Sequence, residues 1–131
     1  MNILVTGGTG FVGKALVEAL LSRGDSVTVL TRSIEKAQAI FPEKTLQFLT
    51  ALSTLKDLNG FDAVINLAGE PIFDKKWTVQ QKEKLRHSRI NLTQQIVQLI
   101  NQSEHLPVLI SGSATGIYGD RGEYVITEDT H

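Results

Sequence analysis

The amino-acid sequence predicts an α/β fold in which helices cover both faces of a doubly wound parallel sheet. Short apolar runs typical of strands alternate with segments of helical periodicity along the whole chain. One of these runs, residues 62–68, is too uniformly apolar for a half-exposed strand and is typical of the middle of a parallel sheet. We therefore expect about five strands in one domain that spans residues 1–131.

The first strand is expected over residues 2–6, and a helix is expected over residues 11–23. In that helix, apolar side chains recur at helical spacing at Val12, Ala15, Leu16, Ala19 and Leu20. Arg23 in the last turn and Gly24 just beyond it mark the end of the helix, because glycine commonly terminates helices at that place. The chain thus begins with one strand, one turn and one helix.

Three further strands and a short helix follow. The second strand is expected over residues 26–31, the third over 46–49 and the fourth over the apolar run 62–68. Between the second and third strands, Ser33 can cap a helix that runs to about Ile40 and stops before a proline.

A long helix and a fifth strand complete the regular structure. Thr78 followed by Gln81 has the spacing of a capping box, so we expect the helix to begin there and to end near Gln102. Its buried positions are expected to include Leu85, Ile96, Val97 and Ile100. The fifth strand is expected over residues 108–111, and the glycines after it break any longer element. Right-handed crossovers then give the strand order 3-2-1-4-5.

The turn between the first strand and the first helix contains glycines at a spacing of three, namely Gly7, Gly10 and Gly13. Such glycines permit a tight turn, close approach of a diphosphate to the backbone, and close packing of helix on strand. Unpaired N–H groups and the positive end of the helix dipole then face the phosphates. The turn therefore predicts a Rossmann-type dinucleotide site in a crevice shared by the loops after Thr6, Thr31, Ala68 and Ser111.

Composition and charge narrow the classes of function. The chain has 13 basic and 14 acidic residues and no long run of either sign, so nucleic acid is not expected as a partner. No apolar stretch is as long as a membrane span and no signal-peptide core precedes the first strand, so we expect a cytoplasmic protein that does not bind membranes. The chain has no cysteine and its three histidines lack ligand spacing, so no metal site is expected.

Three segments, taken in order, resemble the short-chain dehydrogenase/reductase superfamily and, within it, the extended and atypical epimerase/dehydratase-like family. They are residues 6–13 (TGGTGFVG), 66–71 (NLAGEP) and 111–119 (SGSATGIYG), each placed after an expected strand. The resemblance covers nearly the whole chain and implies a nicotinamide dinucleotide cofactor and a small-molecule substrate. Proteins of this family are usually more than twice as long. The resemblance therefore implies a Rossmann-type sheet truncated before the last strands and the substrate lobe.

The same resemblance implies which positions hold the cofactor. The glycine turn would hold the diphosphate, and the loop 67–69 would wrap around the middle of the cofactor. Relatives selective for NAD place an acidic residue at the end of the second strand, whereas this chain has Thr31 and Arg32. Arg32 can pair with a 2'-phosphate, which favours NADP over NAD; a solvated arginine is the alternative. The expected cofactor-binding residues are Gly7, Thr9, Gly10, Phe11, Val12, Gly13, Thr31, Arg32, Leu67, Ala68 and Gly69.

Superfamily members use acid–base chemistry carried out by a tyrosine, a lysine four residues later, and a serine. Ser113 resembles the serine, with Ser111 as the competing position. Neither Tyr118 nor Tyr124 is followed four residues later by a lysine, and in relatives that motif would lie past the last residue of this chain. The resemblance therefore implies the cofactor-binding portion of an NADP-dependent oxidoreductase or epimerase.

Other interpretations stay open. The chain could instead be a non-catalytic module that binds NADP and senses its redox state, because a reductase needs a base of suitable pKa. Residues 8–14 have the spacing of a nucleoside-triphosphate loop, but the next residue, Ala15, lacks the hydroxyl that binds magnesium. An open edge on the fifth strand would favour homo-oligomers.

Two features have both a functional and a structural interpretation. Asn91 resembles a superfamily position that fixes the long helix near the active site, or is a plain surface residue. A substrate-facing loop or a solvated turn would contain Glu70, Lys75, Lys76 and Trp77.

Overall fold

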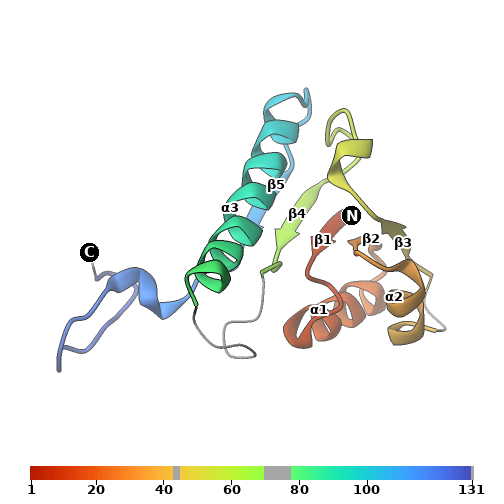
Figure 1. Ribbon diagram of the computed structural model, residues 1–131. Helices are drawn as coiled ribbons and strands as arrows, with labels where there is room; N and C mark the ends of the chain where they lie inside the picture. Colours follow the sequence, from red (N-terminus) through yellow and green to blue (C-terminus); the bar gives the residue numbers. More distant parts are fainter. Residues whose placement is uncertain (43–44, 70–77, 131) are drawn as a thin grey trace.

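The fold is built on a five-stranded parallel sheet in the order β3-β2-β1-β4-β5 (Figure 1). This computed structural model describes residues 1–42, 45–69 and 78–130. The expected strand order is therefore confirmed. Each strand lies within one or two residues of its expected place: β1 Asn2–Thr6, β2 Ser26–Leu30, β3 Gln47–Leu49, β4 Ala63–Asn66 and β5 Val108–Ser111.

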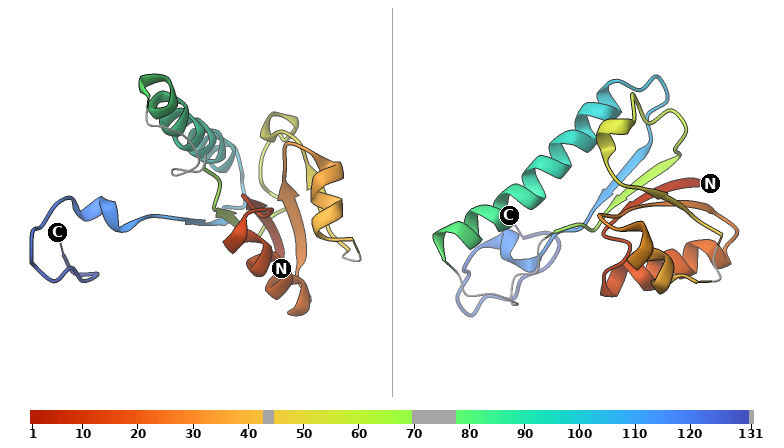
Figure 2. Two further views of the ribbon diagram at one scale, coloured as in Figure 1. Left: turned by 60° about the horizontal axis from the view of Figure 1, so that its bottom comes forward. Right: turned by 45° about the vertical axis from the view of Figure 1, so that its right-hand side comes forward.

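Helices cover both faces of this sheet (Figure 2). The three α-helices of the described ranges are α1 Phe11–Ser22, α2 Ile34–Ile40 and α3 Val79–Asn101. Two short 3-10 helices, η1 Leu52–Thr54 and η2 Thr115–Tyr118, lie in the connections. None of the helices in these ranges is long and apolar enough to cross a membrane.

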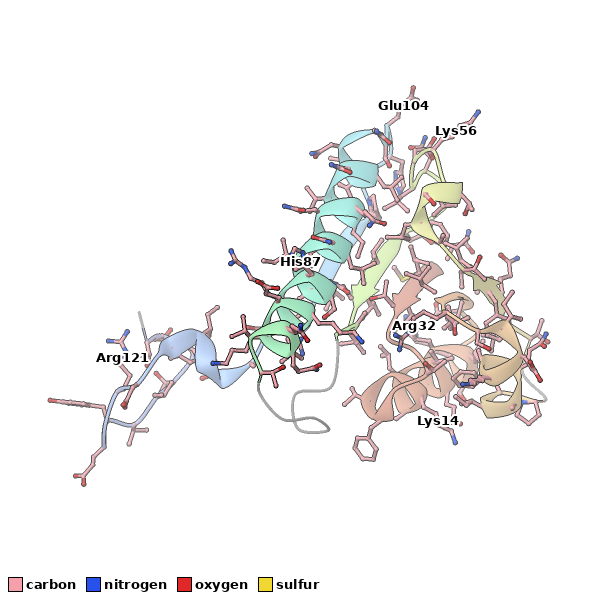
Figure 3. The ribbon with its side chains drawn as sticks, viewed as in Figure 1. Lys14, Arg32, Lys56, His87, Glu104 and Arg121 are labelled. Atoms are coloured by element: carbon pink, nitrogen blue, oxygen red, sulfur yellow. The ribbon has the colours of Figure 1, made fainter. Side chains whose placement is uncertain are left out.

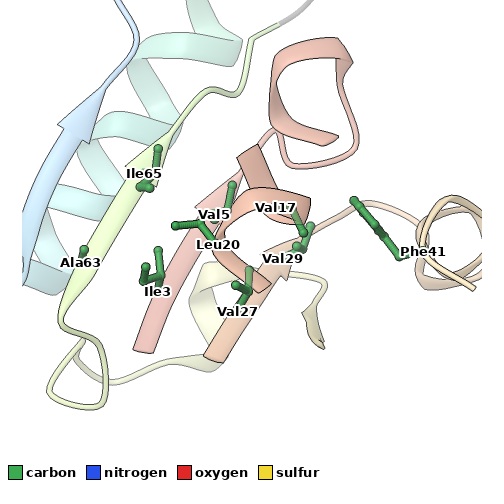
Figure 4. Packing of buried hydrophobic residues seen from close by; sticks show 9 residues of the cluster. All are labelled: Ile3, Val5, Val17, Leu20, Val27, Val29, Phe41, Ala63 and Ile65. Atoms are coloured by element: carbon green, nitrogen blue, oxygen red, sulfur yellow. The ribbon is translucent and has the colours of Figure 1, made fainter. Parts of the chain in front are cut away.

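Alternation along the central strands divides the core into two clusters, because successive side chains of a strand point to opposite faces. Ile3 and Val5 of β1 pack with Val17 and Leu20 of α1 on one face (Figure 4). Leu4, between them in sequence, packs on the other face with residues of α3 and η1. All four residues of β4 are buried, as the uniformly apolar run predicts.

The buried face of α1 differs from the one that apolar spacing suggested. Its buried residues are Gly13, Val17 and Leu20, whereas Val12 is 63% exposed. Ala15 and Ala19 are also exposed and Leu16 is half-buried. The apolar spacing was misleading because the buried stripe begins at Gly13, which apolar spacing does not register, and continues at Val17 and Leu20.

The two helix termini that the sequence predicts from capping residues, the start of α3 and the end of α1, have the expected hydrogen bonds. The Thr78 hydroxyl accepts a hydrogen bond from the Gln81 N–H at 3.1 Å. Gly24, with φ of 88°, ends α1 as the left-handed residue of a Schellman motif in which the Asp25 N–H bonds to the Leu20 carbonyl at 3.1 Å.

On α3, Leu85 and Ile96 are buried as expected and Ile100 is half-buried, but the expectation for Val97 is wrong. Val97 is 39% exposed. It lies about 100° further round the helix than Ile96, outside the stripe that faces the sheet.

The fifth strand is exposed along its whole length, and Val108 is 61% exposed. The chain that follows it extends away from the sheet as far as residue 130 (Figures 1 and 2). Homo-oligomers formed through this edge stay a prediction.

An ionic cluster joins Met1, the residue before β1, to the turn after α1. The Met1 amino group lies 3.0 Å from Oδ1 of Asp25, and Nε of Arg23 lies 2.6 Å from Oδ2 of the same carboxylate. The Asp25 side chain is only 6% exposed. Its hydrogen bonds, first with Arg23 and then with the amino terminus, lower the pKa of the Asp25 carboxyl below its ordinary value.

The substitution Asp25→Asn should lower the melting temperature at neutral pH. The folded-state pKa lies below the unfolded value of about 3.9, so the stabilising contribution is present above that value and is lost as the pH falls through the lowered pKa. Thermal unfolding of the original protein and the variant from neutral to acid pH measures this. Glu123→Gln, which removes an exposed carboxylate, is the control; a deficit in Asp25→Asn that is the same at every pH would contradict the ionic origin.

Candidate cofactor site

A crevice of about 700 Å³ lies at the carboxyl ends of β1, β2 and β4 and is bordered by α3. It brings together the loops after Thr6 and Thr31, as expected where the strand order reverses, and the segment 67–69, because β4 ends at Asn66 rather than at Ala68. The loop after Ser111 was expected to share this crevice, but none of its described residues lines it. The lining residues are Thr6, Gly7, Thr9, Gly10, Leu30, Thr31, Arg32, Ser33, Lys36, Ile40, Thr50, Leu67, Ala68, Gly69, Ser88 and Leu92.

Two glycines of the turn lie where no side chain fits. Gly7 has φ of +71°, and a Cβ built there would lie 2.6 Å from the backbone of Leu67 and 2.8 Å from the nitrogen of Ala68. A Cβ on Gly13 would overlap the carbonyl oxygen of Gly7 and come within 2.7 Å of Cα of Gly8. The turn therefore keeps β1, α1 and the loop after β4 in direct backbone contact.

The first turn of α1 has no side-chain cap. Its N-cap is Gly10, whose own N–H bonds back to the Gly7 carbonyl at 3.0 Å. By contrast, Ser33 caps α2 and Thr78 caps α3 with side-chain oxygens. The N–H groups of residues 11–13 have no partner within an α-helix. They form, together with the helix dipole, a site suited to an anion such as a diphosphate.

Phe11, Val12 and Gly13 contribute no side chain to the crevice. None of the three lines the crevice with its side chain, and the Phe11 side chain is 98% exposed. Their backbone is the first turn of α1, which begins at Phe11 as expected. Their contribution to cofactor binding stays a prediction that concerns main-chain N–H groups.

Two cations line the crevice near the end of β2: Arg32 in the turn after the strand and Lys36 in the first turn of α2. The Thr31 hydroxyl donates to the Ser33 carbonyl at 3.1 Å and accepts from the Ser33 N–H at 3.2 Å, so Arg32 is held in a hydrogen-bonded turn. The Lys36 N–H donates to the Ser33 hydroxyl at 3.3 Å, and Lys36 also lines the crevice. Figure 3 shows Arg32 at the carboxyl edge of the sheet, near the start of α1.

Lys36 and Ser33 were missed as site residues by the sequence reasoning. The available signal was helical geometry: a residue three positions after the cap lies in the first turn, beside the cap itself. The crevice therefore has two cations beside the end of β2, and among the residues that the structure describes no Asp or Glu lines it.

The space at Gly69 is taken by protein. A Cβ on Gly69 would lie 2.8 Å from Cζ of Arg89 and 2.9 Å from its Nη2. Gly69 also lines the crevice, and its contribution to cofactor binding stays a prediction. The missing side chain makes room for a guanidinium that comes from α3.

A buried polar cluster centred on Asn66 joins the elements around the crevice. The Thr6 hydroxyl, which is fully buried, donates to Oδ1 of Asn66 at 2.6 Å. Nδ2 of Asn66 donates to the hydroxyls of Thr93 on α3 at 3.2 Å and Ser111 on β5 at 3.4 Å. One amide thus links β1, β4, β5 and α3 directly beside the loop 67–69.

Other candidate residues lie away from the crevice. Ser113 is exposed and does not line it, and the competing Ser111 is engaged by Asn66. Asn91 is exposed on α3. Lys14 projects away from the sheet (Figure 3), which argues against a nucleoside-triphosphate loop. Outside the described residues lie Glu70, Lys75, Lys76 and Trp77.

The glycine turn, the uncapped helix and the crevice at the reversal of strand order define a dinucleotide-binding α/β protein. Residues 3–131 match the model of the NAD dependent epimerase/dehydratase family, and the chain belongs to this family. The family resemblance of the sequence is thereby confirmed.

Curated relatives are similar along the whole of this chain. The chloroplastic SDR39U1 homologue of Arabidopsis thaliana, an epimerase family protein, is 40% identical over 99% of this chain and 39% of its own length. The epimerase family protein YfhF of Bacillus subtilis is 38% identical over 99% of this chain and 43% of its own. The chain thus spans about two fifths of the length of these relatives.

Solved structures share the fold. The human epimerase family protein SDR39U1, crystallised with NADPH, superposes with a TM-score of 0.66 at 32% identity, over 86% of this chain and 37% of that chain. UDP-glucose 4-epimerase from Bifidobacterium longum, in complex with NAD⁺ and UDP, superposes with a TM-score of 0.77 at 21% identity, over 100% and 42%. The second likeness concerns the fold alone.

The substitution Gly13→Ala should destabilise the protein, because its methyl group would collide with the backbone of Gly7 and Gly8. Overpacking of this kind costs about 1–3 kcal/mol or more. Urea unfolding measures the loss. Gly60→Ala is the matched control, since no atom lies within 4 Å of the added Cβ; equal stability of the two variants would refute the close approach of α1 to the turn.

The substitution Asn66→Leu should cost about 1–3 kcal/mol of unfolding free energy, because it leaves the buried Thr6 hydroxyl without its acceptor at similar side-chain volume. Ser111→Ala, which removes the longest and most exposed bond of the cluster, should cost less. Chemical denaturation of both variants tests the ranking, and a larger loss in Ser111→Ala would overturn it.

Proposed function

We propose that this chain is the cofactor-binding portion of an NADP-dependent oxidoreductase or epimerase that acts on a small molecule. The observation that carries the proposal is the combination of an uncapped α1 terminus with Arg32 and Lys36 at one crevice. The uncapped helix terminus suits a diphosphate, and the two cations suit a further phosphate on the adenosine side of the cofactor.

The preference for NADP follows from charge. A carboxylate that accepts a ribose 2'-OH would repel a 2'-phosphate, and no Asp or Glu of the described residues lines the crevice beside Arg32. Arg32 presents a planar fork of donors suited to phosphate oxygens, and Lys36 adds a point charge beside it. The NADPH in the human relative's crystal structure supports this assignment.

The cofactor, when bound, supplies a hydride acceptor or donor. The residues of this chain bind and orient it: the turn at Gly7 and Gly10 receives the diphosphate, and the loop 67–69 borders its middle. The proposed acid–base step needs groups beyond these residues, with Ser113 as the candidate hydroxyl from this chain. Nothing in the comparisons favours the alternative of a redox-sensing module without chemistry.

NADPH should bind more tightly than NADH, and Arg32→Ala should weaken NADPH by roughly tenfold while leaving NADH nearly unchanged. The reason is that a charge-assisted hydrogen bond to phosphate, reduced by solvent exposure, contributes about 1–2 kcal/mol. Isothermal titration calorimetry measures both ligands.

Lys36→Ala should show a smaller loss of the same selectivity, and Lys14→Ala, outside the crevice, should show none. Failure of both dinucleotides to bind a folded sample would refute the proposed function. Equal losses for NADPH and NADH in Arg32→Ala would refute the assigned role of Arg32.

A further inference from the structure

β5 is an edge strand of the sheet, and its side chains are exposed on both faces. It pairs with β4 on one side, and Val108, Leu109 and Ile110 are 61%, 36% and 52% exposed. The chain that follows Ser111 extends away from the sheet (Figure 2). Among the residues that the structure describes, no strand pairs with the outer edge of β5. Exposed apolar side chains that lie together in this way mark an interaction surface.

The backbone of β5 has hydrogen-bonding groups that β4 does not use. The Val108 N–H donates to the Asp62 carbonyl at 3.0 Å. The Gly112 N–H donates to the Asn66 carbonyl at 2.9 Å. Alternate residues of a strand direct these groups to opposite sides, so Leu109 directs its N–H and C=O groups to the outer edge. The strand itself has no charge, proline or bulge that would oppose further pairing.

The side chains of β5 divide between the two faces of the sheet. Leu109 is in register with Val64, which packs in one cluster with residues of α3, so Leu109 lies on the α3 face. Val108 and Ile110 are in register with two residues of β4 that belong to the cluster on the α1 face. Both faces of β5 therefore offer apolar contacts to a strand placed beside it.

Apolar side chains of α3 extend the exposed surface on one face. Asn66 donates to both Thr93 and Ser111, so Thr93 marks the side of α3 that faces β5. Ile90 and Val97 lie three residues before and four residues after Thr93, and therefore on the same side of the helix. They are 40% and 39% exposed and line a hollow of about 580 Å³. The exposed apolar surface thus reaches beyond the strand itself.

We propose that β5 pairs with the β5 strand of a second copy of this chain, in an antiparallel arrangement centred on Leu109. The inference does not depend on the proposed function. In this arrangement Leu109 lies opposite the same residue of the second copy, and the two exchange both of their N–H···O bonds. Val108 lies opposite Ile110 of the second copy on the other face, so these cross-strand pairs are all apolar.

Symmetry and charge favour a second copy over another occupant. A register centred on Ile110 would place Leu109 opposite the polar Ser111, so the register centred on Leu109 buries more apolar surface. β5 carries no charge and the chain has a formal net charge of -1, so two copies do not repel each other strongly. Because both copies use the same edge, the assembly closes as a dimer.

The protein should show a concentration-dependent equilibrium between monomer and dimer. Leu109→Lys should raise the dissociation constant by at least about tenfold, because two like charges would lie directly opposite each other. Ile34→Lys is the matched control: it makes the same kind of change on α2, at 38% exposure compared with 36%, and should leave the dimer unchanged. Sedimentation equilibrium measures the constants, and circular dichroism verifies that each variant is folded.

Cysteine variants test the register, since the chain has no cysteine of its own. A mixture of Val108→Cys and Ile110→Cys should form disulfide-linked dimers under mild oxidation. The Cα atoms of such an opposed pair lie about 4.5 Å apart, within the range of a disulfide. Either variant alone should form far fewer, because the two identical residues then lie on opposite sides of the two-fold axis. These variants also test the proposal if Leu109→Lys fails to fold.

Three outcomes would overturn the proposal. The first is a protein that stays monomeric at every concentration, which would leave the edge to another occupant, such as a later segment of a longer polypeptide of this family. The second is a dimer that Leu109→Lys and Ile34→Lys weaken equally. The third is cross-linking that is as fast in each cysteine variant alone as in the mixture. None of these results bears on NADPH binding, so the proposed function is tested separately.

Discussion

The site depends on one constraint, the absence of side chains where α1 meets β1. Gly7 and Gly13 lie so close to neighbouring backbone that a methyl group on either would collide with it. Because Gly10 provides no side-chain cap, the first N–H groups of α1 have no partner from a capping side chain or from within the helix. The three glycines of the turn thus allow both the close packing of α1 on β1 and the anion site at the start of α1.

The surrounding structure holds this turn in place. Alternate residues of β1 enter two separate core clusters, so the strand is fixed from both faces. Asn66 ties the end of β4 to Thr6, Thr93 and Ser111, which aligns the loop 67–69 above Gly7. The sheet edge and the polar cluster therefore hold the loop 67–69 in position, although its own side chains are small or apolar.

The strand order and the glycine turn were predictable from the sequence, because alternating periodicity and Gly7, Gly10 and Gly13 are local signals. The burial of α1 and of Val97 was not, because apolar spacing gives no weight to the buried Gly13 and cannot locate the sheet relative to a long helix. Lys36 was missed although helix geometry places it beside the cap Ser33, and the contact of Gly69 with Arg89 could not be predicted because the two residues are twenty positions apart.

The most direct test of the account is a crystal structure of the protein with NADPH. We expect the diphosphate to lie against the backbone N–H groups of residues 11–13, with the 2'-phosphate beside Arg32. Density for NADPH elsewhere on the molecule, or protein atoms filling the crevice beside an intact glycine turn, would contradict the central claim that this bare turn is a diphosphate site.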